Sequence, residues 1–197
     1  MDIGFLGLKG GSGATSGVDG YDHIGMIDAS GGVLDQDYEM FEQQTPHLLL
    51  KHEYWTDSAG AGQWRGGLGV ETMFRIGGEN TKVVTFGDGD VESPFGLFGG
   101  KGATLNKIEL RYPDGRVYQA TSKDLVEQVP SGTILFQQAG GGGGYGPPDS
   151  RDLVKVAQEV KNGILSIKRA KEDYHVVVDP ETLELNLEET EEIRKGK

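Results

Sequence analysis

Residues 132–148 read GTILFQQAGGGGGYGPP, and this stretch carries the strongest structural signals of the chain. Its first nine residues have the β-branched and aromatic content of a strand. Gly140–Gly144 are all glycine and cannot continue a strand or a helix at low entropic cost. Pro147 and Pro148 then prevent a helix from starting before Asp149. The stretch therefore predicts a strand, a glycine loop and the entry to a helical region.

The chain before this stretch has the pattern of short strands joined by turns. Strand-like apolar runs lie at 48–55, 69–78, 82–89 and 106–120. In the last run, Tyr112-Pro113-Asp114-Gly115 is a turn signal between two alternating segments, which predicts a β-hairpin. A glycine-rich segment precedes these strands, and its short apolar start needs a neighbour to pair with.

The pattern after the stretch is helical. Asp149 or Ser150 is expected to cap a helix that ends at Asn162-Gly163, and Ser166 is expected to cap a second, short helix. The run HVVVDPETLELNL (175–187) predicts two strands around an Asp-Pro turn. The last ten residues predict a charged, solvated tail that frays.

Together these patterns predict an α+β fold, a β-rich glycine-loop domain with two short helices and a hairpin near the C-terminus. We expect four parts. These are a glycine-rich entry segment that packs on a partner chain (1–47), a β-rich core (48–148), a helical and hairpin part (149–187) and a charged tail (188–197).

Composition excludes several classes of function. The net charge of −12 disfavours binding to nucleic acid. The lack of cysteine excludes disulfides, thiolate metal sites and a cysteine nucleophile. No apolar run approaches the length of a membrane span, and no signal-peptide pattern opens the chain, so we expect a cytoplasmic protein with no membrane partner. Glycine makes up 33 of the 197 residues without a collagen-like triplet period, which favours a loop-rich, strand-rich fold.

Two glycine-rich loops have some features of anion sites. The loop GGSGATSG (10–17) lacks the Gly-Lys-Ser/Thr ending of a phosphate loop, so we expect a flexible or partner-ordered loop. Gly140–Gly146 lies between a strand and a helix, but its prolines differ from a dinucleotide fingerprint. We interpret it as a close-packing loop at a subunit interface, with binding of an anionic ligand as the alternative.

The acidic and histidine motifs have ordinary explanations. The run 87–92 resembles part of a calcium loop without the remaining ligands, so we expect a turn between strands. Asp22-His23 and His52-Glu53 are adjacent pairs, whereas a metal site needs three or four converging ligands. Neighbours in a strand also point to opposite faces. The residues therefore predict no metal site. No nucleophile elbow or pair of catalytic acids is visible either, so the catalytic residues stay unknown.

The run HEYWTDSAGAGQWRGGLG (52–69) resembles a signature of the hydantoinase B / oxoprolinase / ketone carboxylase family. That signature reads aspartate-serine-glycine-glycine-alanine-glycine, an aromatic residue, then arginine-glycine-glycine, and Ala59 stands where glycine is usual. Further blocks follow in the family's order: FGLFGG (95–100), Gly140–Gly146, Arg151-Asp152 before a helix, Asn162-Gly163, and Ala170–Tyr174 with Val176-Val177. Together the blocks span about residues 45–180.

The resemblance implies a function within an assembly. Family members pair with a hydantoinase A-type subunit that binds ATP. They hydrolyse cyclic amides such as 5-oxoproline and hydantoins, or carboxylate ketones such as acetone and acetophenone. Family B-type chains are much longer than this one, and the resemblance covers their C-terminal portion. It therefore implies a separate B-type N-terminal chain with a divalent metal, manganese or zinc, and ATP and magnesium on partner chains, with no cofactor on this chain alone.

We therefore interpret the chain as a small subunit, the split C-terminal part of a B-type subunit, of an ATP-dependent ketone carboxylase. A subunit of a cyclic-amide hydrolase and a non-catalytic binding module are the alternatives. The chain alone is expected to be inactive and unstable outside its hetero-oligomer. The candidate interface or ligand-loop residues are Trp64, Arg65, Gly140, Gly141, Gly142, Gly143, Gly144, Tyr145 and Gly146.

Overall fold

The computed structural model describes residues 9–24 and 37–195, and within them the fold is α+β, as the sequence predicts. The strands are β1 (Leu48–Tyr54), β2 (Val70–Arg75), β3 (Thr81–Phe86), β4 (Lys107–Arg111), β5 (Val117–Ala120), β6 (Lys123–Val129) and β7 (Ile134–Gln138). The helices are α1 (Tyr38–Gln44), α2 (Leu153–Lys161), α3 (Ile167–Tyr174) and α4 (Leu187–Lys195), with a 3₁₀ turn, η2 (Pro148–Ser150). None of these helices is long and apolar enough to cross a membrane.

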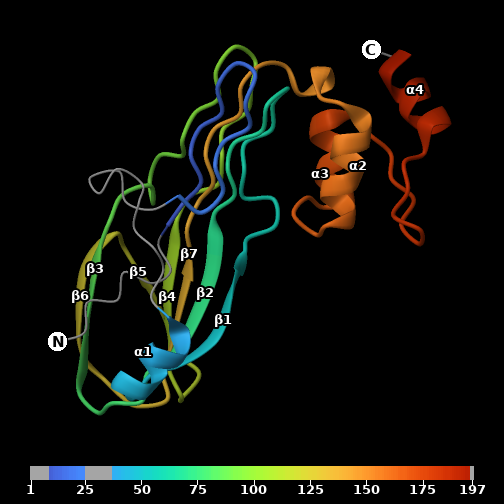
Figure 1. Cartoon of the computed structure of the whole chain (residues 1–197). Helices are drawn as coiled ribbons and strands as arrows, with labels where there is room; N and C mark the ends of the chain where they lie inside the picture. The colour runs from blue at the N-terminus through green and yellow to red at the C-terminus, as the bar shows by residue number, and fades with distance from the viewer. Residues whose placement is uncertain (1–8, 25–36, 196–197) are drawn as a thin grey trace.

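Five strands form an antiparallel sheet in the order β1-β2-β7-β4-β5. The hairpin expected at 106–120 is present, with β4 paired to β5 around a turn that Gly115 closes at a φ of 88°. Because β7 pairs with both β2 and β4, it lies at the centre of the sheet. The glycine run that follows β7 therefore leaves from the middle of the fold (Figure 1).

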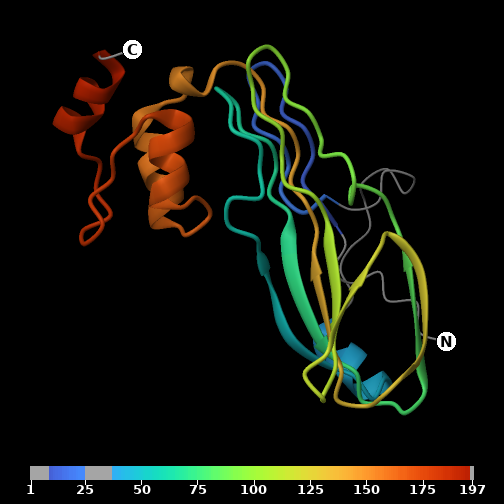
Figure 2. The ribbon, with the colours of Figure 1, turned by 180° about the vertical axis from the view of Figure 1, so that it is seen from behind.

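A separate two-stranded ribbon, β3–β6, curves away from the main sheet (Figure 2). Val83 and Val129 of the ribbon pack with Ile108 and Leu110 of β4 in a shared apolar cluster. The sequence pattern did not indicate β6, because charged residues interrupt its apolar positions. On the outer face of the ribbon, the alternation leaves Val84 exposed.

The short helix α1 is also absent from the sequence prediction. Asp37 caps it by accepting a hydrogen bond from the Met40 N–H at 3.0 Å. Its single buried residue, Phe41, packs edge-on against Phe74 of β2 with ring centroids 5.5 Å apart. One buried side chain in a seven-residue helix leaves no periodic signal in the sequence.

The prediction that Asp149 or Ser150 caps the first C-terminal helix is wrong. Both residues lie in or beside η2, and Arg151 continues in extended conformation before the helix begins. The cap of α2 is Asp152, whose Oδ1 accepts from the N–H groups of Val154 and Lys155 at 2.9 and 3.0 Å. Pro147 is extended and Pro148 opens the 3₁₀ turn, so the α-helix begins later than the sequence pattern indicates.

The expected cap of the next helix is correct, since the Ser166 hydroxyl accepts from the Arg169 N–H at 3.1 Å. The expected C-terminal hairpin is reduced to one isolated bridge, Val178 with Leu185. The expected frayed tail is instead helix α4. Its Thr190 is fully buried and donates to the Asn186 carbonyl at 2.6 Å. Arg194 also anchors the helix by donating to the Tyr174 carbonyl at 2.8 Å.

Candidate functional site

The run Gly140–Gly144 lies inside a bundle of extended backbone, with its residues buried. Segments of the same chain surround it: 10–14, 58–61, 66–69, 95–101 and 104–106. Successive glycines hydrogen-bond to different neighbours. Gly142 accepts from Gly60 N–H and donates to the Gly67 carbonyl, both at 2.9 Å. Gly144 donates to the Lys101 carbonyl at 3.0 Å.

These contacts are too close for any side chain. A Cβ on Gly142 would lie 1.8 Å from the Ser12 carbonyl oxygen, and a Cβ on Gly143 would lie 1.9 Å from that of Phe95. As at the axis of collagen, only glycine fits at such a crossing. The glycine run therefore packs on this chain's own backbone, and its role toward a partner or ligand stays a prediction.

The entry loop 10–17 is part of the same bundle. Ala14 N–H donates to the Gly143 carbonyl and Gly67 N–H donates to the Ser12 carbonyl, at 2.9 and 2.8 Å. The expectation of a flexible or partner-ordered loop is therefore wrong for residues 10–14, because this chain orders them itself.

The structure brings together the candidates Trp64 and Tyr145. Their backbones exchange two hydrogen bonds, at 2.9 and 3.1 Å, and their rings meet edge-on with centroids 5.7 Å apart. Phe98 covers Tyr145 from a centroid distance of 5.0 Å and is itself 74% exposed. This aromatic cluster therefore closes the end of the bundle and faces solvent.

Arg65 is held by two carboxylates. Its Nε donates to Glu159 of α2 and its Nη1 to Asp22 Oδ1, both at 2.8 Å. Nη1 also donates to the Gly66 carbonyl at 2.8 Å. With these donors engaged inside the chain, Arg65 joins α2 to the glycine bundle.

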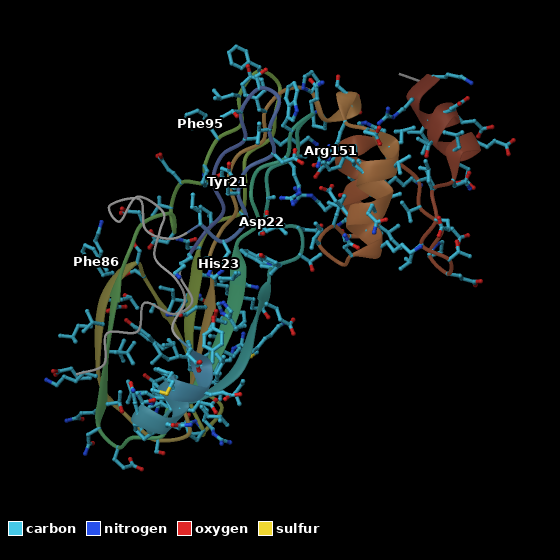
Figure 3. All side chains as sticks on the ribbon, in the orientation of Figure 1. Tyr21, Asp22, His23, Phe86, Phe95 and Arg151 are labelled. Atoms are coloured by element: carbon cyan, nitrogen blue, oxygen red, sulfur yellow. The ribbon has the colours of Figure 1, made fainter. Side chains whose placement is uncertain are left out.

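Arg151 completes the ion network, and Figure 3 shows it between the glycine segments and α2, on the side where Asp22 lies. Its side chain is 2% exposed and forms a bidentate pair with Asp19, with both bonds at 2.7 Å. Its Nη2 also donates to Glu159 Oε1 at 2.8 Å. Two guanidinium groups thus meet three carboxylates in a largely buried cluster, which is where such groups need partners.

The network shifts the pKa values of its members. Burial lowers the pKa of Arg65, but the hydrogen bonds that it donates to Asp22 and Glu159, together with the charges of those two carboxylates, raise the pKa overall. Burial likewise opposes the charge of Arg151, and its pKa is raised by Asp19 and Glu159. Burial raises the pKa of Asp19, yet the hydrogen bond and charge of Arg151 hold it below its ordinary value. All three groups are therefore kept charged, as in a structural clamp.

Sequence reasoning missed this network. Asp19 and Arg151 are 132 positions apart, so no local pattern links them. One signal was present, because Glu159 lies within the apolar stripe of α2 beside the buried Val156 and Val160. A carboxylate on a buried helix face requires a cationic partner.

The two histidine motifs also meet. His23 and His52 have ring centroids 5.2 Å apart, and His52 Nδ1 lies 2.8 Å from the Thr72 hydroxyl. Asp22, beside His23, is engaged by Arg65. Within residues 9–24 and 37–195, no group of three or more histidines and carboxylates is placed to hold a metal ion. The placement of a divalent metal on a partner chain stays a prediction.

The acidic run at 87–92 lies in the loop after β3. There Asp90 accepts from the N–H and the hydroxyl of Ser122, at 2.8 and 2.9 Å. Its carboxylate therefore fastens the start of β6 to the end of β3.

Several known proteins of similar sequence are named as subunits of enzymes. The chain is 33% identical over 173 residues to the caprolactamase subunit beta of Pseudomonas jessenii, covering 86% of this chain and 30% of that protein. It is 26% identical to the acetone carboxylase alpha subunit of Xanthobacter autotrophicus, covering 85% of this chain and 26% of that subunit.

A solved nucleotide-free structure of acetone carboxylase shares the fold, with a TM-score of 0.83 and 22% identity. It covers 96% of this chain, which corresponds to 29% of that chain. The chain thus spans less than a third of the length of the proteins it matches. The family model described as hydantoinase B/oxoprolinase matches residues 4–148. This match covers most of the chain, which therefore belongs to the hydantoinase B/oxoprolinase family.

Proposed function

We propose that the chain is a scaffold segment of an ATP-dependent assembly that acts on the carbonyl group of a ketone or a cyclic amide. The observation that carries the proposal is the position of the family's glycine blocks. They form one bundle, in which Gly60 N–H donates to the Gly142 carbonyl and Gly144 N–H donates to the Lys101 carbonyl. A core of this kind holds its loops in fixed positions without itself presenting side chains for chemistry.

The partners follow from the length of the relatives. Since the chain spans 30% of one relative and 26% of another, we propose that a B-type N-terminal polypeptide supplies the remaining part. A hydantoinase A-type subunit would supply ATP binding, with magnesium. The divalent metal would be held outside this chain, and the assembly would work in the cytoplasm.

Two chemistries are candidates. Ketone carboxylation is the reaction we inferred first from the sequence, and the likeness to the acetone carboxylase alpha subunit supports it. The higher identity to the caprolactamase subunit beta, 33% against 26%, favours hydrolysis of a cyclic amide. We propose the cyclic-amide reaction as the first to assay and ketone carboxylation as the second.

Co-expression tests the proposal. The tagged chain is produced with the B-type N-terminal polypeptide and the A-type subunit of the same organism. We expect stoichiometric recovery and substrate-dependent ATP hydrolysis, first with lactams and hydantoins and then with acetone and acetophenone. A monomer that turns over either substrate class by itself would contradict the proposal.

A further inference from the structure

The described residues leave one side of the molecule unusually apolar. Exposed fractions are 69% for Val84, 87% for Phe86, 81% for Val91, 78% for Phe95 and 57% for Leu125. Val84 and Leu125 are direct cross-strand partners on the outer face of the β3–β6 ribbon. Phe86 and Phe95 lie on the side away from helices α2–α4 (Figure 3). We name these five residues the apolar edge.

A groove lies within the apolar edge. It has a volume of about 540 Å³ and runs between the end of β3 and the strands β4 and β5. Phe86, Val91 and Ile108 supply apolar lining, and Asp88 and Asp90 lie at the same groove. The rest of the lining is largely polar, and both acids are engaged inside the chain, Asp88 by Lys123 and Asp90 by Ser122. The groove can therefore take an apolar side chain at its Phe86 and Val91 end.

The glycine bundle packs against the end of the apolar edge at which Phe95 lies. Gly143 packs against the Phe95 carbonyl, and Leu97 N–H donates to the Gly144 carbonyl at 2.9 Å. Phe98 adopts a φ of 51°, a conformation that a non-glycine residue keeps only where its surroundings impose it. The chain thus orders residues 95–98 in advance while leaving their aromatic side chains exposed. Side chains ordered before binding lose less entropy when a partner covers them.

The length of the relatives indicates what covers this edge. They carry the same fold in much longer chains, of which this chain spans 29% in the solved structure and 30% in the caprolactamase subunit. The additional polypeptide has to pack on some face of this fold. Large exposed apolar patches mark such contacts, and they are uncommon on free surfaces.

We propose that the apolar edge docks the remaining polypeptide of a hydantoinase B protein, with Phe86 and Phe95 as its anchors. The docked surface is apolar, as the exposed side chains of the edge require. This inference rests on the proposed function, because it names the contact through which the scaffold segment joins its assembly.

The test measures binding in the co-expressed assembly. The probe is the B-type N-terminal polypeptide of the same organism, and its affinity for the full chain is compared with that for Phe86→Ser/Phe95→Ser. Both phenylalanines are mostly exposed, so the melting temperature of the free chain is expected to stay unchanged. Loss of two aromatic anchors is expected to weaken binding by about 30-fold or more. The matched control is Val154→Ser, because Val154 is 69% exposed and α2 lies on the opposite side of the molecule from the β3–β6 ribbon (Figure 1). The control is expected to bind like the unaltered chain.

Three results would overturn the inference. These are equal affinity of the double variant and the control, no binding of the probe by the unaltered chain, and a dimer of the free chain that the double variant dissociates. The proposed function is judged separately by ATP hydrolysis in the full assembly. An assembly that turns over substrate while the double variant binds normally would reject the docking edge and retain the function.

Discussion

The glycine bundle is stabilised by one kind of interaction and the C-terminal helical part by another. Around Gly140–Gly144, backbone groups of neighbouring segments bond directly to one another and leave no room for side chains. In the helical part, Val156, Ala170 and Val176 are fully buried and form an apolar core with Tyr174. The bundle gains hydrogen bonds at the entropic cost of ordering glycine, whereas the helices gain burial of apolar surface. We therefore expect the bundle to reject substitutions that the helical part tolerates.

A side chain in the middle of the bundle tests this contrast most directly. Gly142→Val is expected to destabilise the chain by about 3 kcal/mol or more, because the new side chain overlaps the backbone at Ser12. Gly143→Val is expected to act in the same way against Phe95. The measurements are the free energy of unfolding, subunit recovery and ATP-dependent turnover of the reconstituted complex.

The matched control is Gly87→Ala, since no atom lies within 4 Å of a Cβ at Gly87. It is expected to change the free energy of unfolding by less than about 0.5 kcal/mol. Full activity of Gly143→Val would show that the run is a flexible linker, and the contrast between the two regions would disappear.

The ion network between the regions gives the next largest effect. Arg151→Met leaves Asp19 and Glu159 in a largely buried site without this cation, and the expected loss is about 3–5 kcal/mol. Urea unfolding of the purified protein measures it. The control is Arg116→Met, which breaks an exposed pair with Asp114 and is expected to cost at most about 1 kcal/mol. Equal losses in the two variants would show that the regions are not coupled through the buried network.

Acid should weaken the same ion network. Because the pKa of Asp19 is lower in the folded chain than its ordinary value of 3.8, its contribution to stability is present above that value. The contribution is lost as the pH falls through the lowered pKa. The difference in unfolding free energy between Asp19→Asn and the unaltered chain is therefore expected to shrink below about pH 4. If this difference in unfolding free energy stayed constant from neutral pH down to about pH 2, Asp19 would not contribute to the loss of stability in acid.

The two regions also differ in how far their structure follows from local sequence. Strand-like apolar runs predicted the positions of β1, β2, β3, β7 and the β4–β5 hairpin, and Ser166 predicted the start of α3. Helix α4 gave no such signal because its buried residue, Thr190, is polar and the residues around it are charged. The sequence predicted that the glycine run follows a strand, but it did not indicate which backbone segments pack around the run.

The ion network shows why the rest of the site could not be predicted. Trp64 and Arg65 stood out through the family signature, and the structure does place Trp64 against Tyr145. The acids that hold the two arginines come from the entry segment and from α2, far apart in sequence. Only the fold brings these charges together, so single-sequence patterns cannot reveal them.

The C-terminal helix should show the smallest effect. Glu191 and Lys195 form an exposed pair one helical turn apart, at 3.1 Å, and replacing either with alanine is expected to cost less than about 0.5 kcal/mol. Thr190→Ala in the same helix is expected to cost about 1–2 kcal/mol, since the Thr190 hydroxyl accepts from the Val177 N–H and donates to the Asn186 carbonyl. Thermal unfolding of the three variants separates the two cases. If Glu191→Ala proved as costly as Thr190→Ala, surface charge would hold α4 in place. Because Thr190 is fully buried and the pair is exposed, we expect the buried hydroxyl to hold it instead.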